Sequence, residues 1–227
     1  EWDPAGKKVS ELRFVDGAPV QNLLTGQRID STEIENVAFS RDGTKVYTLT
    51  SRSGTDAKAR QLTTFSLPGP FDISSYTLVH QVDFFDLDVT DDGDVIEIGR
   101  GIEFNQDGSA MFLLVGNTDE NDETDRAKNY IYQFSLSKNF DVSTATKVGR
   151  LQLGLGTFGN RASDSNGEPR GFTFASDGMK LFILDNRPPA SAVDQINQFR
   201  LECPFGIVSC TSDAVSYTHL RAHETKA

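Results

Sequence analysis

Apolar and polar residues alternate along most of the chain in short runs, and the same order of runs returns three times. Each copy has an apolar strand, an Asp-Gly pair and a second apolar strand, over 36–49, 101–114 and 171–184. An Asp-Gly pair between two alternating strands predicts a β-hairpin, because Gly adopts the positive φ that a tight turn requires. Three hairpins in the same frame define a repeat.

Two further strands are predicted after each hairpin. A third strand with the same Phe and Leu spacing covers 61–67, 130–136 and 195–201. A turn that carries Phe71, Phe140 or Phe205 leads to a fourth alternating strand, which covers 76–84 and 146–153 in the first two copies. Four sequential strands per unit predict the blade of a β-propeller. A solenoid or a β-sandwich is the alternative arrangement.

The repeat frame predicts how the chain is divided. Residues 1–16 carry the last strand of a preceding blade, and 33–84, 100–153 and 170–211 are successive blades, of which the last is incomplete. Three blades are fewer than the four to eight that close a ring. We therefore expect an all-β, partial β-propeller of four-stranded antiparallel blades, with exposed strand edges at its ends.

The segment 215–227 does not fit the repeat. Residues 215–225 read as one translated frame of the transposon-end adapter used in sequencing libraries, as expected of a metagenomic read. We expect this tail to be non-native, which excludes His219 and His223 as a helical pair of metal ligands. The chain is then expected to be a fragment cut at both ends.

The charge balance limits the classes of partner. The net charge is −11, and no apolar run approaches the roughly 18 residues of a membrane span. Nucleic-acid binding needs basic patches, so we expect no nucleic-acid partner and no membrane span. An acidic chain of this kind suits an extracellular or cell-envelope setting.

Both cysteines fall in the turn after the third strand of the last copy. Cys203 and Cys210 appear together in this copy, and the other two copies have none. A local disulfide that closes this turn is the interpretation we favour, and it implies an oxidising compartment. Two unrelated thiols are the alternative.

Two acidic loops are candidates for calcium binding. In the first, Asp88, Asp92 and Asp94 approach the ligand spacing of a calcium loop, although Thr90 and Gly99 replace two expected ligands. The second loop offers a dense set of side-chain oxygens. Its candidate ligands are Asp119, Asn121, Glu123 and Asp125. Solvated acidic loops without metal are the alternative in both places.

An axial ligand site is predicted at the start of each first strand. Arg100 and Arg170 directly precede two of these strands, and Glu35 and Asn36 hold the corresponding place in the first copy. The first strand of a propeller blade lines the central channel, so these side chains are candidates for binding an anionic or sugar-like group. Ion pairs with neighbouring acidic loops are the alternative. The sequence has no nucleophile elbow and no phosphate-binding loop, and it predicts no catalytic residue.

The repeated unit combines the Phe-x-x-Asp-Gly hairpin with a Phe-Ser-Leu third strand and a Phe-Asp turn. Over 33–211 it resembles the propeller repeats of bacterial and phage surface proteins of the YVTN and TolB-like type. The resemblance implies a secreted or surface-associated binding or scaffold module, with a carbohydrate or another surface protein as partner. An adhesin or phage receptor-binding component is one alternative. A calcium-dependent lactonase or hydrolase on a gluconolactonase-like propeller is the other.

Overall fold

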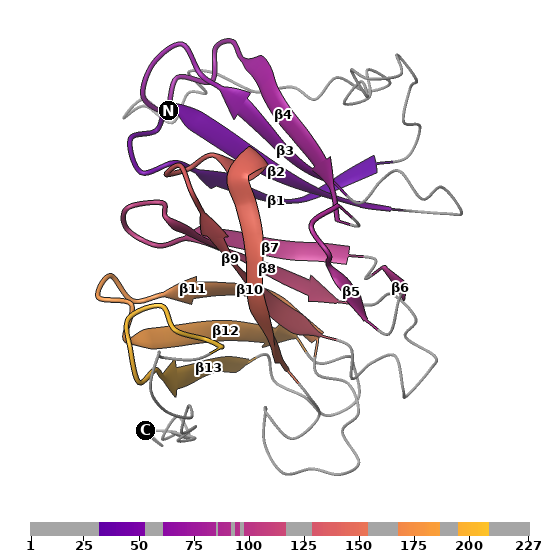
Figure 1. Cartoon of the computed structure of the whole chain (residues 1–227), viewed down its shortest axis with the longest axis vertical. Helices are drawn as coiled ribbons and strands as arrows, with labels where there is room; N and C mark the ends of the chain where they lie inside the picture. Colours follow the sequence, from indigo (N-terminus) through magenta and orange to yellow (C-terminus); the bar gives the residue numbers. More distant parts are fainter. Residues whose placement is uncertain are drawn as a thin grey trace, which may run out of the picture.

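Three antiparallel sheets follow one another along the chain and lie one above the next in space (Figure 1). The computed structural model describes residues 32–52, 61–84, 86–91, 94–95, 98–116, 129–153, 168–186 and 195–208. The first sheet has its four strands in sequence order. They are β1 (Thr32–Phe39), β2 (Lys45–Arg52), β3 (Gln61–Ser66) and β4 (Thr77–Asp83).

The second sheet repeats this order, and the third has three described strands. The second contains β7 (Ile98–Phe104), β8 (Ala110–Gly116), β9 (Tyr130–Leu136) and β10 (Ala145–Gln152), with a 3₁₀ turn at Val142–Thr144. The third contains β11 (Glu168–Phe174), β12 (Lys180–Asn186) and β13 (Gln195–Arg200). A short hairpin of β5 (Thr90–Asp91) and β6 (Asp94–Val95) lies between the first two sheets in sequence.

The three predicted Asp-Gly hairpins are present. Gly43, Gly108 and Gly178 have φ values of 68°, 73° and 69°, in the left-handed region that favours glycine. The aspartate before each glycine accepts a hydrogen bond from the backbone amide two residues later; for Asp107 and Ser109 this bond is 3.0 Å long. The turn residues therefore fix the hairpin register in each sheet.

A phenylalanine from the turn after the third strand closes over each hairpin glycine. Phe71, Phe140 and Phe205 themselves have positive φ, at 56°, 58° and 59°. Each donates its backbone N–H to the carbonyl of the hairpin glycine in its own sheet, at 2.8, 2.9 and 2.8 Å. The Phe ring covers the glycine so closely that a Cβ atom would not fit. The two turns of each sheet are therefore locked together.

Aromatic contacts join one sheet to the next at equivalent positions. The Tyr47 ring on β2 lies 4.6 Å from that of Phe104 on β7, and the Phe112 ring on β8 lies 4.7 Å from that of Phe174 on β11. One apolar cluster fills the boundary between the first and second sheets, and another fills that between the second and third. Burial of each such side chain contributes about 1.5–3 kcal/mol to stability.

The first strands of the sheets lie next to one another, since β7 contacts both β1 and β11. Sequential four-stranded meanders with neighbouring first strands are the arrangement of propeller blades around an axis. The chain is thus all-β and has the fold of a partial β-propeller. In the part of the chain that the structure describes, no helix is long and apolar enough to cross a membrane.

Candidate functional site

Each first strand contains a β-bulge at the same position. The pairing register shifts between Ile34 and Asn36, between Gly99 and Gly101, and between Pro169 and Gly171. The extra residue is Glu35 in β1, Arg100 in β7 and Arg170 in β11. Bulges re-aim side chains, and they are common beside functional sites. Three of the four predicted axial residues are therefore the bulged residues of their strands.

The bulge residues have different environments. Arg100 is 5% exposed, and its Nε atom lies against Gly116 beside the side chain of Asn129. Glu35 and Arg170 are exposed. The predicted binding of an anionic or sugar-like group by these residues stays a prediction.

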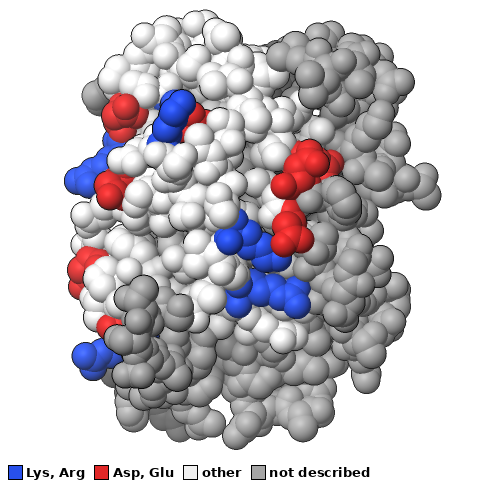
Figure 2. Space-filling view, viewed as in Figure 1, with Lys and Arg blue, Asp and Glu red and all other residues white. Residues whose placement is uncertain are grey.

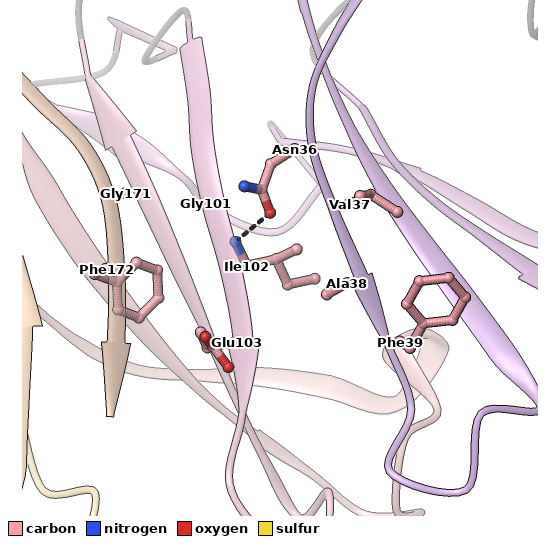
Figure 3. Close-up of a pocket in the computed structure, with 9 residues that line it drawn as sticks. All are labelled: Asn36, Val37, Ala38, Phe39, Gly101, Ile102, Glu103, Gly171 and Phe172. Atoms are coloured by element: carbon pink, nitrogen blue, oxygen red, sulfur yellow. Dashed lines mark hydrogen bonds between the residues drawn. The ribbon is translucent and has the colours of Figure 1, made fainter. Parts of the chain in front are cut away.

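A groove lies between the first strands, just beyond the bulges (Figure 3). Its volume of about 330 Å³ is at the lower end of the range for small-molecule sites. Gly101 and Gly171 contribute backbone to the lining; the space beside Gly171 is open, whereas the Phe172 ring lies against Gly101. The other lining residues are Asn36, Val37, Ala38, Phe39, Ile102, Glu103 and Phe172.

Asn36 is the predicted site residue that lines this groove. Its side-chain oxygen accepts a hydrogen bond from the backbone N–H of Ile102 at 3.3 Å, which links β1 to β7. This contact holds the first strands of two sheets together at the groove wall. The Asn36 oxygen is therefore partly committed to the fold, while its amide nitrogen can donate to a ligand.

Glu103 is the charged residue among those that line the groove. Its carboxyl group is half-buried, and this burial raises its pKa above the ordinary value, although a hydrogen bond with the Thr173 side chain opposes the shift. Figure 3 shows Glu103 near Phe172, with Phe39 on the opposite side of the groove. The groove thus combines an acceptor group with aromatic surface.

Sequence reasoning missed Glu103. The residue stands where the other two first strands have Ala38 and Thr173, so a charged side chain within an apolar strand was the available signal. Its significance depends on β11 lying beside β7. The two strands are far apart in sequence, and the alternation within one strand does not report such a neighbour.

The first predicted calcium loop is described only in part. Asp88 forms a salt bridge with Lys147 on β10, with 2.8 Å between Oδ2 and Nζ, and its backbone carbonyl accepts from the same Nζ atom. Asp92 and the side chain of Asp94 lie outside the described residues.

The second predicted calcium loop lies outside the described residues altogether, with Asp119, Asn121, Glu123 and Asp125. Among the residues that are described, no group of three or more His, Cys, Asp or Glu side chains is placed to hold a metal ion. Calcium binding in either loop stays a prediction.

Cys203 lies in the turn after β13, two residues before Phe205, and it is half-buried. Cys210 lies outside the described residues, so the predicted disulfide stays a prediction.

Charged side chains are dispersed on the face shown in Figure 2. Acidic and basic groups form small clusters separated by uncharged surface, and no broad basic area is visible on this face. A nucleic-acid interface would require such an area. The absence of a nucleic-acid partner stays a prediction from the net charge.

Comparisons with known proteins find similarity to solved structures at the level of the fold. The sequence matches no family model and no curated protein, so membership of the YVTN or TolB-like type stays a prediction. Similar solved structures include the periplasmic gluconolactonase of Pseudomonas aeruginosa, with 21% identity, a TM-score of 0.44 and coverage of 82% of this chain and 41% of that one.

Two further solved structures have the same level of likeness. The β-propeller domain of Myceliophteria thermophila Cps50 is 12% identical, with a TM-score of 0.38 and coverage of 70% of this chain and 37% of that one. An exo-β-1,3-galactanase from Phanerochaete chrysosporium is 12% identical, with a TM-score of 0.43 and coverage of 82% and 36%. The chain spans about two fifths or less of the length of these three solved chains.

Proposed function

We propose that this chain is a non-enzymatic, secreted or surface-associated binding module, and that the groove between its first strands takes a neutral, hydroxyl-rich ligand such as a carbohydrate. The observation that carries the proposal is the position of Glu103 beside Phe172 in an open groove. The acidic net charge and the predicted disulfide support a location outside the cytoplasm.

The chemistry of the groove favours a neutral ligand over an anion. A carboxylate accepts hydrogen bonds from ligand hydroxyl groups, and such charge-assisted bonds are the stronger kind. The half-buried ring of Phe172 offers apolar surface for the C–H face of a sugar ring. No Lys or Arg is among the described residues that line the groove, so an anionic ligand would meet Glu103 without a balancing charge.

A glycan array and calorimetric titration with neutral oligosaccharides test the proposal. We expect binding of a neutral glycan, and we expect Glu103→Gln and Phe172→Ala each to raise its Kd about tenfold, which corresponds to about 1.4 kcal/mol. Val79→Ala is the control, because Val79 is exposed on β4 and does not line the groove. The control should bind like the parent chain.

Two results would overturn the proposal. One is the absence of binding to every neutral glycan, or a Kd that neither groove substitution changes. The other is calcium-dependent hydrolysis of a lactone by the purified chain, which would assign it to the enzymatic class instead. Binding of glycans from a bacterial surface would support the adhesin form of the proposal.

A further inference from the structure

A side-chain amide caps a backbone N–H where the first strands of the first two sheets meet. The Asn36 Oδ1 atom on β1 accepts from the N–H of Ile102 on β7 at 3.3 Å, and Figure 3 shows this bond crossing between the two strands. The N–H that it caps lies on the edge of β7 away from β8. A carboxamide is therefore the group that this chain itself places on such an N–H.

The equivalent N–H in the third sheet is that of Phe172, which faces Ile183 on β12. The Ala175 N–H donates to the Lys180 carbonyl at 2.9 Å, and hydrogen-bonded pairs alternate with non-hydrogen-bonded pairs in an antiparallel ladder. Phe172 and Ile183 are three pairs further along, so they form a non-hydrogen-bonded pair. The Phe172 N–H therefore points away from β12, toward the edge of β11 with which no described strand pairs.

The side chain that would cap this N–H is missing at the second boundary. Gly101 on β7 holds the place of Asn36, because each residue directly follows the bulge of its strand. A Cβ atom on Gly101 would lie 3.1 Å from the ring of Phe172, so the ring packs on the glycine backbone. β7 therefore supplies no carboxamide to the Phe172 N–H.

A carboxyl group stands next to this position instead. Glu103 follows Gly101 by two residues, so both lie on the same face of β7. The corresponding residue of β1 is Ala38. The Glu103 carboxyl group accepts from the Thr173 hydroxyl on β11, and a carboxylate has room for further hydrogen bonds. The groove thus offers a backbone donor on β11 and a carboxyl acceptor on β7.

We propose that the groove recognises the acetamido group of an N-acetylated amino sugar. The amide carbonyl of the ligand accepts from the Phe172 N–H, as the Asn36 oxygen accepts from the Ile102 N–H, and the amide N–H of the ligand donates to Glu103. The inference rests on the proposed function and names the chemical class of its ligand.

The shape of an acetamido group suits these two partners. A trans amide is planar and presents its carbonyl and its N–H on opposite sides, which fits a donor and an acceptor on neighbouring strands. Its methyl group can pack on the half-buried ring of Phe172. A hydroxyl group in the same place has no apolar part, and a carboxylate would be repelled by Glu103.

Calorimetric titration of the parent chain with two matched pairs of sugars tests the inference. One pair is triacetylchitotriose and cellotriose, and the other is the methyl glycosides of N-acetylgalactosamine and galactose. Within each pair the members differ by acetamido groups in place of hydroxyl groups. We expect the acetamido member of at least one pair to bind about tenfold more tightly, because the hydroxyl member loses a hydrogen bond and the methyl contact.

Gly101→Asn supplies the missing carboxamide. We expect this side chain to cap the Phe172 N–H and to abolish the preference for the acetamido member. Gly101→Ala is the matched control, because its Cβ atom meets the same ring but carries no amide, so the preference should remain. Circular dichroism checks the folding of both variants. In the parent chain, the NMR resonance of the Phe172 amide should shift with the acetamido member and not with its partner.

Equal Kd values within both pairs would overturn the inference and leave the proposed function standing, since a neutral glycan would still bind. A Phe172 amide resonance that does not respond to a bound acetamido sugar, or a folded Gly101→Asn variant that keeps the preference, would also overturn it. Absence of binding to all of these sugars and to every other neutral glycan would overturn the proposed function and the inference together.

Discussion

The hydroxyl group of Tyr47 donates a hydrogen bond to the backbone carbonyl of Phe140 across the boundary between the first two sheets, with 2.7 Å between the oxygens. The Lys45 Nζ atom donates to the same carbonyl at 2.9 Å. Tyr47 is fully buried, and this burial raises the pKa of its phenol well above the usual range. The phenol is therefore a permanent donor at physiological pH.

Removal of this hydroxyl group should destabilise the fold only moderately. We expect Tyr47→Phe to lower the free energy of unfolding by about 0.5–1.5 kcal/mol, because one hydrogen bond is lost while Lys45 still pairs with the carbonyl. The ring itself fits, since Phe112 holds the equivalent place. Urea denaturation measures the change, with Tyr76→Phe at a 43% exposed position as control. An unchanged midpoint would show that the bond contributes nothing.

The hairpin glycines should not tolerate alanine. Gly108→Ala places a Cβ atom under the ring of Phe140 and at a φ of 73°, so we expect a loss of at least about 1–2 kcal/mol. Gly171→Ala is the matched control, because no atom lies within 4 Å of its Cβ position. Thermal unfolding should show a lower Tm for the first variant and an almost unchanged Tm for the second. Equal effects would contradict the locking of the two turns.

The hairpin aspartates should make stability depend on pH. The hydroxyl and the backbone amide of Ser109 donate to Asp107 at 2.7 and 3.0 Å, and they hold the pKa of its carboxyl below the usual value. A lowered folded-state pKa stabilises the fold above the ordinary pKa of 3.8, and this contribution is lost as the pH falls through the lowered value.

We therefore expect Asp107→Ala to lower the Tm at neutral pH and to approach the parent's Tm in strong acid. Tm measured by calorimetry across acidic and neutral pH checks this. Asp177→Ala is the comparison, because residue 179 is a methionine that offers a backbone amide but no hydroxyl. Its effect should be smaller. A difference between Asp107→Ala and the parent that persists in strong acid would contradict the electrostatic origin.

The predicted disulfide can be tested by peptide mapping. We expect a linked peptide that contains Cys203 and Cys210 under non-reducing conditions, and its loss after reduction. Closing a loop of this length stabilises the folded state by about 2–3 kcal/mol in the chain-entropy description. The double variant Cys203→Ser with Cys210→Ser should unfold at correspondingly lower urea concentration. Recovery of two free thiols from the native chain would show that the prediction is wrong.

Most of the strand order could be predicted from the sequence, because it depends on local signals. The Asp-Gly pairs at Gly43, Gly108 and Gly178 mark the hairpins, and alternation of period two marks the strands on either side. The third strand predicted at 61–67 is β3 (Gln61–Ser66), and the fourth predicted at 76–84 is β4 (Thr77–Asp83).

The candidate site was harder to predict, because it depends on contacts between sheets. A bulge adds one residue to a strand and changes which face the following side chains occupy, so Arg100 could not be placed from alternation alone. The groove exists because β1, β7 and β11 lie together. No single repeat contains that information. Glu103 was missed for the same reason.

The locked turns divide each sheet into a constant end and an adaptable end. The Asp-Gly hairpin and its covering Phe occupy one end, whereas the connection from the second to the third strand, after Arg52 in the first sheet and Gly116 in the second, must leave from the other. Segments inserted at that second end do not disturb the turn that sets the register. Evolution or a library designer can therefore vary the sequence at the second end of each sheet while the hairpin and its covering Phe at the other end keep the strands in register.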